Sequence, residues 1–253
     1  MRMPSFRVDG RKALITGASR GIGLAAACAL TQAGAQVVLA ARTESDLQAA
    51  KQVVLEAAPD AQVALWTLDV TDSAAVRRGM IEYGPFHVVV NNAGTNRPAL
   101  LSHLEDADLD DVIDLNVKAA FYVTREAARL MQENSLRGSV INMSSQMGHV
   151  GGPKRTVYCA TKHAIEGFSK ALALELGPAA IRVNTICPTF IETEMTKTML
   201  NDPAFKQYVD SNIALGRMAS LEDIMGAVVF LASDASAMIT GSSIMVDGGW
   251  TAS

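Results

Sequence analysis

Tyr158 and Lys162 are the two side chains whose types and spacing best suit acid–base chemistry. They form a Tyr-x-x-x-Lys arrangement, and an i,i+4 spacing brings two side chains to the same face of a helix. A free phenol has a pKa of about 10, and an ammonium about 4 Å away supplies roughly the 4 kcal/mol needed to lower it to about 7. Tyr158 is therefore a candidate general acid or base.

Ser145 and Asn116 extend this candidate catalytic group. Ser145 follows a predicted strand, and its hydroxyl suits a substrate oxygen on which negative charge develops. Asn116 lies inside a long predicted helix, and we expect it to orient Lys162 through a water molecule. The four histidines lie in unrelated local settings, so the sequence predicts proton transfer rather than a histidine-activated nucleophile.

A glycine-spaced turn, G-x-x-x-G-x-G, follows the first predicted strand. Gly17 allows a tight turn, Gly21 lets the backbone approach a pyrophosphate, and Gly23 lets the next helix pack close to the sheet. The beginning of that helix offers unpaired N–H groups and a positive dipole to an anion. The turn thus predicts a dinucleotide site, with these candidate contacts: Gly17, Ser19, Arg20, Gly21, Ile22 and Gly23.

The end of the second predicted strand bears on the choice between NAD(H) and NADP(H). NAD-dependent enzymes usually have an Asp or Glu there that binds both ribose hydroxyls. In this chain no acidic residue occupies that position, and the strand is followed by Arg42-Thr43. Arg20 and Arg42 can converge on one phosphate, with Thr43 as a hydroxyl donor; the alternative is that both arginines are solvated surface residues. We expect NADP(H) to be preferred over NAD(H). Further candidate cofactor contacts are Asp69, Val70, Asn92, Ala93, Gly94, Tyr158 and Lys162.

Strand-like and helix-like segments alternate along the whole chain. Unbroken apolar runs such as Val88–Val90 are typical of parallel strands buried on both faces. The alternation predicts an α/β fold, a doubly wound Rossmann-type parallel sheet with helices on both faces, whose ligands bind where the strand order reverses. The predicted strands are Ala13–Thr16, Gln36–Ala41, Val63–Asp69, His87–Asn91, Ser139–Ser144, Arg182–Ile186 and Ser243–Val246. The predicted helices lie near 21–33, 44–57, 72–83, 108–133, 157–176 and 221–232.

Composition narrows the class of protein further. With 49% hydrophobic and 19% charged residues and no linker, residues 1–253 are predicted to form a single dinucleotide-binding catalytic domain. A net charge of −4 gives no basic field for nucleic acid or anionic membranes. Cys28, Cys159 and Cys187 lie far apart without metal-ligand spacing, so reduced thiols and no metal site are expected. The absence of a signal-peptide core and of long apolar runs predicts a cytoplasmic protein.

Two predicted helices, 108–133 and 157–176, are apolar on more than one face. Such a helix is buried either in a large core or against another subunit, and we favour subunit contact. The acidic stretch Glu105–Asp114 is interpreted as a solvated helix start rather than a metal site, because no histidine or cysteine accompanies it at ligand spacing.

These motifs resemble, in order and from Lys12 to Trp250, the short-chain dehydrogenase/reductase family. The resemblance implies a seven-stranded Rossmann-type sheet, hydride transfer at a hydroxyl or carbonyl carbon, and a homotetramer in which the two apolar helices pair between subunits. It implies further that Ile191 and Thr193 bind the nicotinamide carboxamide and that a substrate lid follows. The motifs are Thr16–Gly23, Asn91–Gly94, Asn116, Ser145, Tyr158, Lys162 and Pro188–Thr193, and Pro188 is counted with the cofactor contacts.

The sequence departs from the family pattern at Thr189, where the usual residue is glycine. A β-branched residue does not easily take a positive φ, so the backbone there is expected either to differ or to be strained.

The predicted reaction is hydride transfer between NADP(H) and a small ketone, sugar or polyol, with Tyr158 as the general acid or base. Some segments are similar to xylulose and carbonyl reductases and others to sugar dehydrogenases and 3-oxoacyl carrier-protein reductases. Reduction of a 3-oxoacyl chain on a carrier protein is therefore the alternative, with the basic pair Lys154 and Arg155 near the site. A more remote alternative is a protein that binds NADP(H) as a sensor and catalyses no reaction. The candidate substrate contacts are Asn96, Ser145, Gln146, His149, Tyr158, Met195 and Met199, and a plain surface residue is the alternative for His149.

Overall fold

The computed structural model describes residues 3–192 and 202–252, which contain a seven-stranded, all-parallel sheet in the order β3-β2-β1-β4-β5-β6-β7. The order reverses between β1 and β4, as a doubly wound sheet requires, so the predicted fold class is confirmed. The strands are β1 (Lys12–Thr16), β2 (Gln36–Ala41), β3 (Val63–Thr67), β4 (Val88–Asn91), β5 (Ser139–Met143), β6 (Arg182–Pro188) and β7 (Ser243–Val246).

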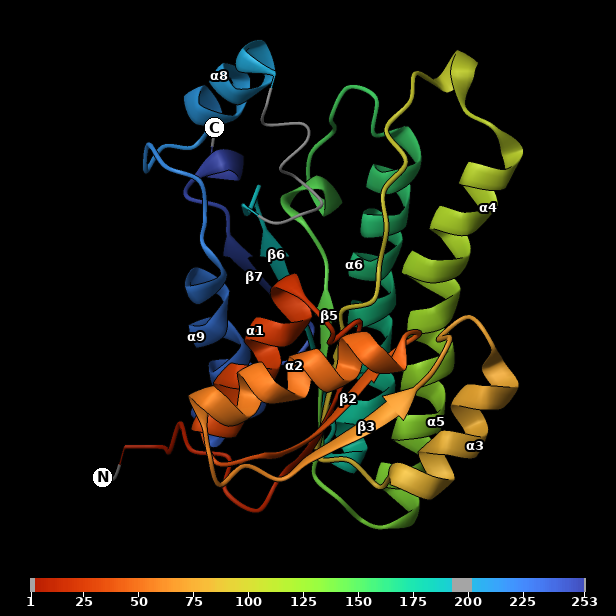
Figure 1. Cartoon of the computed structure of the whole chain (residues 1–253), viewed down its shortest axis with the longest axis vertical. Helices are drawn as coiled ribbons and strands as arrows, with labels where there is room; N and C mark the ends of the chain where they lie inside the picture. Colours follow the sequence, from red (N-terminus) through yellow and green to blue (C-terminus); the bar gives the residue numbers. More distant parts are fainter. Residues whose placement is uncertain (1–2, 193–201, 253) are drawn as a thin grey trace.

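Helices cover both faces of the sheet (Figure 1), with α1, α2 and α9 on one face and α3, α5 and α6 on the other. Successive side chains of β1 alternate between the two cores: Ala13 and Ile15 pack on the α1 side, and Leu14 packs on the α5 side. This two-sided burial explains unbroken apolar runs such as Val88–Val90 in β4. The helices are α1 (Gly21–Gln32), α2 (Glu44–Ala57), α3 (Ser73–Tyr83), α4 (Asp106–Ile113), α5 (Ala119–Glu133), α6 (Thr156–Leu176), α8 (Pro203–Asn212) and α9 (Leu221–Ala232).

Helix α8 is absent from the sequence-based prediction, although its sequence carries start signals. The Asp202 carboxylate accepts the Ala204 N–H at 3.0 Å, and Pro203 stands in the first turn. Phe205 meets Phe190 edge-on, with ring centres 5.5 Å apart, so α8 closes a small aromatic cluster of its own. The helix was not predicted because its sequence has no apolar stripe: Val209 is its only buried side chain.

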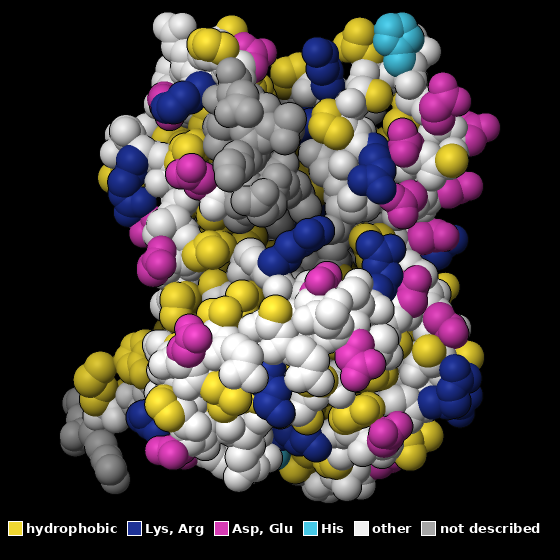
Figure 2. Space-filling view, viewed as in Figure 1, with side chains coloured by type: hydrophobic (Ala, Val, Ile, Leu, Met, Phe, Trp, Pro, Cys, Tyr) yellow, Lys and Arg dark blue, Asp and Glu magenta, His cyan; other side chains and the backbone are white. Residues whose placement is uncertain are grey.

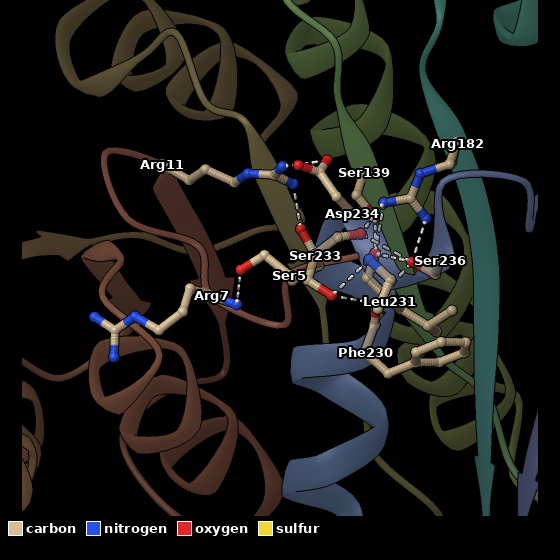
Figure 3. Close-up of polar contacts among 12 residues, drawn as sticks. Ser5, Arg7, Arg11, Ser139, Arg182, Phe230, Leu231, Ser233, Asp234 and Ser236 are labelled. Atoms are coloured by element: carbon tan, nitrogen blue, oxygen red, sulfur yellow. Dashed lines mark hydrogen bonds and ion pairs between the residues drawn. The ribbon is translucent and has the colours of Figure 1, made fainter. Parts of the chain in front are cut away.

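Two arginines anchor the carboxyl end of α9 to the sheet (Figure 3). Arg182, on β6, donates to the Leu231 carbonyl at 2.8 Å and to Ser236 Oγ at 2.9 Å. Arg11 donates to the Ala232 carbonyl and to Asp234, both at 2.6 Å. Guanidinium groups thus satisfy the carbonyls that a helix end leaves unpaired, and their charge complements the negative end of the helix dipole.

The acidic stretch Glu105–Asp114 covers α4 and faces solvent, and Figure 2 shows acidic side chains gathered over this helix. Arg97 pairs with Asp108 at 3.3 Å and with Asp111 at 2.8 Å, and Lys118 pairs with Asp114 at 2.6 Å. The stretch is therefore a solvated helix start with nearby basic partners. None of the helices in the described part of the chain is long and apolar enough to cross a membrane.

Candidate active site

The glycine turn lies at the point where the strand order reverses, between β1 and β4. Gly17 and Gly21 have φ values of +63° and +55°, which glycine adopts without strain. A Cβ on Gly23 would lie 2.3 Å from the Gly17 carbonyl oxygen. Asn92, just after β4, donates to the Thr16 and Gly17 carbonyls at 3.0 and 3.1 Å. The turn, the start of α1 and the loop after β4 are therefore packed too closely to admit a side chain at Gly23.

A pocket of about 550 Å³ opens above this turn and brings together most of the predicted cofactor contacts. Gly23, Pro188 and Ile191 are not in its lining, and Thr193 falls outside the described residues. The predicted residues in the lining are Gly17, Ser19, Arg20, Gly21, Ile22, Arg42, Thr43, Asp69, Val70, Asn92, Ala93, Gly94, Tyr158 and Lys162. Lining residues missed by the sequence include Asp46 and Leu221, which come from segments that carry no cofactor motif, and Thr95 and Leu115, which lie beside motif residues.

Charged side chains mark one end of this pocket. Arg20 and Arg42 are exposed on its wall, and among the described residues neither has an ion-pair partner. Asp69 is fixed in place, because its Oδ1 accepts the Thr71 N–H at 2.9 Å and the Thr71 hydroxyl at 2.7 Å. These bonds, with a smaller contribution from the charge of Arg42, hold the pKa of Asp69 below its usual value. The pocket thus offers two exposed arginines and a carboxylate, Asp69, that hydrogen bonds hold in place.

Tyr158 and Lys162 project from the same face of α6 into the pocket wall, as their spacing predicts. The Lys162 ammonium lies 5.5 Å from the centre of the Tyr158 ring and donates to the Met143 carbonyl at 2.7 Å. Lys162 is buried, and loss of solvation lowers its pKa from 10.5 to about 8. The end of β5 therefore holds this ammonium beside the tyrosine.

The pKa of Tyr158 differs from the expectation. Desolvation raises it, while the hydrogen bond with Ser145 and the positive charge of Arg155 lower it without compensating fully. The physical reason is that a phenolate loses more solvation in the pocket wall than the protein's own groups return. Ser145 is itself held in place, since its hydroxyl accepts the Met147 N–H at 3.1 Å.

Asn116 lies in a π-helical turn, Asp114–Lys118, between α4 and α5. Its Oδ1 accepts the Thr95 N–H at 2.8 Å, and its Nδ2 donates to the Thr95 carbonyl at 2.9 Å and to Thr161 Oγ1 at 3.1 Å. Asn116 and Lys162 also share the wall of a cavity of about 10 Å³, close to the space that one water needs. The sequence predicted one continuous helix here, whereas the structure has a π turn that contains the buried Asn116.

The predicted substrate contacts are only partly gathered together. Ser145 and Gln146 are buried, with Ser145 Oγ 3.4 Å from Gln146 Oε1, and Asn96 is half-buried. Of the described candidates, only Tyr158 is in the lining of the large pocket. The ring of His149 lies against Glu166 and Cys187. Met195 and Met199 fall outside the described residues.

Thr189 is not strained. Among the described residues, positive φ values outside glycine occur at Ser135, Lys154 and Ala180 only. The Thr189 N–H donates to the Val246 carbonyl at 3.1 Å, which extends the β6–β7 pairing by one residue. Of the two expected outcomes, a different backbone is the one observed.

Comparison with known proteins places this site among related enzymes. Residues 17–251 match a family model described as Enoyl-(Acyl carrier protein) reductase. A D-erythrulose reductase of Gallus gallus is 38% identical over 250 residues, which cover 99% of each protein. A 3-oxoacyl-[acyl-carrier-protein] reductase of Chlamydia trachomatis is 40% identical over 243 residues, 94% of this chain and 96% of that one. A solved gluconate 5-dehydrogenase of Burkholderia cenocepacia, in complex with NADP and tartrate, superposes with a TM-score of 0.93 and 33% identity, covering 98% of both chains.

Proposed function

Because the chain belongs to the short-chain dehydrogenase/reductase family, we propose that it interconverts a small ketone, sugar or polyol and its redox partner with NADP(H). Members of this family bind a nicotinamide cofactor and act on alcohol or ketone groups. The observation that carries the proposal is the placement of Tyr158 and Lys162. Both side chains stand in the wall of the pocket that opens above the glycine turn. A proton donor and its ammonium neighbour thus face the space in which a cofactor and a substrate would meet.

The residues of the pocket fit a dinucleotide phosphate. The close approach of Gly23 to Gly17 leaves room only for backbone at the turn, where the first N–H groups of α1 would hold a pyrophosphate. Arg20 and Arg42, which have no ion-pair partner among the described residues, would bind the additional phosphate of NADP(H). When bound, the nicotinamide donates or accepts the hydride.

Proton transfer falls to the chain's own side chains. In the direction of reduction, the Tyr158 hydroxyl gives its proton to the substrate oxygen, and the Ser145 hydroxyl donates a hydrogen bond to that oxygen as negative charge develops. The phenolate left behind is stabilised by the nearby Lys162 ammonium, which the Met143 carbonyl keeps in position. Oxidation of an alcohol runs the same transfers in reverse.

We favour small sugars as the substrate class because relatives named for a ketose and for a sugar acid match almost the whole chain. The rival is a 3-oxoacyl chain on a carrier protein, which the family description and one relative favour. Only one residue of the basic pair that could dock an acidic carrier protein lies at the surface. Arg155 is buried beside Tyr158, and only Lys154 is exposed.

The experiment that tests the proposal is the Tyr158→Phe variant, assayed at the nicotinamide absorbance with small ketoses, sugar acids, polyols and an acetoacetyl thioester. We expect kcat to fall roughly 10²–10⁴-fold, because the proton donor is gone. NADPH binding, followed by fluorescence, is expected to persist. Tyr83→Phe, a tyrosine stacked on Trp66 away from the pocket, is the matched control. Near wild-type turnover by Tyr158→Phe would refute the role, and turnover confined to the thioester would favour the carrier-protein rival.

Cofactor preference is tested by Arg42→Ala. Loss of a charged hydrogen bond of about 1.5–3 kcal/mol is expected to lower kcat/KM for NADPH roughly 10–100-fold, with kcat/KM for NADH little changed. Arg125→Ala, an exposed arginine on α5, serves as the control. Equal efficiency with both cofactors in the wild type, unchanged by Arg42→Ala, would contradict the assignment of NADP(H).

A further inference from the structure

Three potential metal ligands meet behind the catalytic lysine. They are His149, in the loop that follows Ser145, Glu166 on α6, and Cys187 on β6. Cys187 Sγ lies 3.3 Å from Glu166 Oε1 and 3.5 Å from His149 Nε2, and the last two atoms are 3.6 Å apart. None of the three side chains is in the lining of the large pocket, so they form a cluster separate from the cofactor site.

The three separations suit tetrahedral zinc. Zinc binds thiolate sulfur at about 2.3 Å, imidazole nitrogen at about 2.0–2.1 Å and carboxylate oxygen at about 2.0–2.2 Å, so tetrahedral donor pairs lie roughly 3.4–3.6 Å apart. The observed 3.3, 3.5 and 3.6 Å agree to within a few tenths of an ångström. Little rearrangement of the donor atoms is needed to admit the ion.

The surroundings of Glu166 orient it as a ligand. Its other oxygen, Oε2, accepts hydrogen bonds from Ser243 Oγ at 2.6 Å and from Thr185 Oγ1 at 3.0 Å, which leaves Oε1 turned toward His149 and Cys187. Outer hydrogen bonds of this kind fix the carboxylate ligands of metal sites. Glu166 and Cys187 are buried, whereas the His149 side chain is 30% exposed and offers a route from solvent.

We propose that His149, Glu166 and Cys187 bind one Zn²⁺ ion, with a water molecule in the fourth position. A thiolate with imidazole and carboxylate favours zinc over magnesium or calcium. On binding, the Cys187 S–H bond breaks, a Zn–S bond forms and one proton passes to solvent, without electron transfer. Because Glu166 follows Lys162 by one turn of α6, the ion would lie close to the catalytic group but outside the cofactor pocket.

The test uses the full chain, freed of any affinity tag and treated with a chelator. Equilibrium dialysis against Zn²⁺ is expected to give one ion per chain, and Co²⁺ is expected to give a thiolate-to-cobalt charge-transfer band. Cys187→Ser should remove that band, and Glu166→Gln or His149→Asn should weaken zinc binding at least roughly tenfold. Ser243→Ala, which frees the outer oxygen of Glu166, should weaken binding to a smaller extent.

Matched controls are available for the thiol and for the imidazole. Cys159→Ser and His163→Asn alter residues outside the cluster and should leave zinc affinity and the cobalt band unchanged. Retained NADPH binding shows that each variant is folded. Failure of the wild type to bind zinc more tightly than Cys187→Ser, or a cobalt band lost in Cys159→Ser instead, would overturn the proposal; the cluster would then be a hydrogen-bonded packing contact.

Discussion

At the scale of single residues, Lys162, Ser145 and Asn116 of the candidate catalytic group are fixed by hydrogen bonds between their polar side-chain atoms and the backbone. Lys162 is bound to the Met143 carbonyl, Ser145 to the Met147 N–H, and Asn116 to both backbone atoms of Thr95. Fixed side chains lose little further freedom when a substrate binds, which favours a productive geometry. The cost is desolvation, which lowers the pKa of Lys162 and raises that of Tyr158.

Lys162 should give the reaction an alkaline limit. Its pKa is lowered to about 8, so its ammonium is lost as pH rises through that value, and with it the charge that stabilises the Tyr158 phenolate. We expect kcat/KM for carbonyl reduction to fall above about pH 8, measured from initial rates at saturating NADPH. A profile that stays level well beyond that pH would contradict the role of the ammonium.

The lowered pKa of Lys162 also makes the free energy of unfolding depend on pH. The unfolded lysine, at 10.5, binds its proton more tightly than the folded one, so stability increases with pH between about 8 and 10.5. Below about pH 8 the full cost of burying the ammonium remains. Replacement by methionine, which keeps a long side chain without the charge, should remove this pH dependence from the free energy of unfolding while abolishing activity.

Sequence reasoning found the residues that carry motifs and missed those that meet only through the fold. Tyr158 and Lys162 share one helix, so their spacing predicts their contact. Asp46 was missed because it reaches the pocket from the first turn of α2, which has no cofactor pattern. The contact of His149 with Cys187 on β6 was likewise not predicted, because the sequence offered only its nearness to Ser145. Distances between separate elements are set by packing, which spacing along the chain does not encode.

At the scale of elements, central strands such as β1 and β4 were predicted closely because double-sided burial favours apolar runs. The predicted range Val63–Asp69 ends earlier, at Thr67, where the chain leaves the sheet for the pocket. The π turn, Asp114–Lys118, was missed because a single inserted residue hardly disturbs helical periodicity. The departures therefore concentrate at the carboxyl edge of the sheet, where the candidate site lies.

The packing of the glycine turn against α1 predicts a specific loss in Gly23→Ala. The added Cβ would lie 2.3 Å from the Gly17 carbonyl oxygen and 2.5 Å from Asn92 Nδ2, so α1 or the loop after β4 must move. We expect the Kd for NADPH, measured by fluorescence titration, to rise roughly 10–100-fold, because small misplacements at a binding site have effects of that size.

Gly226→Ala in α9 is the matched control for this substitution. A Cβ there meets nothing within 4 Å, so cofactor binding should not change. Stability should increase by about 0.5–1 kcal/mol, the usual gain of alanine over glycine within a helix. Unchanged NADPH affinity in Gly23→Ala would show that the turn tolerates a side chain and does not act as a backbone cradle.

At the scale of the whole molecule, α5 and α6 leave apolar side chains uncovered. Phe121 on α5 is 46% exposed and contacts Phe168 of α6 in a tilted ring pair, with ring centres 3.9 Å apart. Leu174 is 82% exposed. Ala164 and Ala171 of α6 are exposed as well. A connected apolar surface of this kind marks a place where another protein binds. Both helices are those that the sequence predicts to pair between subunits of a homotetramer.

Leu174→Glu tests that prediction. If α6 pairs with its copy, each subunit loses about 1.5–3 kcal/mol of apolar burial and must desolvate a new carboxylate, so the assembly should dissociate to smaller species. Sedimentation velocity and light scattering measure the change at micromolar concentration. Ile81→Glu alters an equally apolar side chain, 65% exposed on α3, and should leave the tetramer intact. A monomeric wild type, or a Leu174→Glu variant that remains tetrameric, would contradict pairing through α6, and the uncovered face would then need another partner.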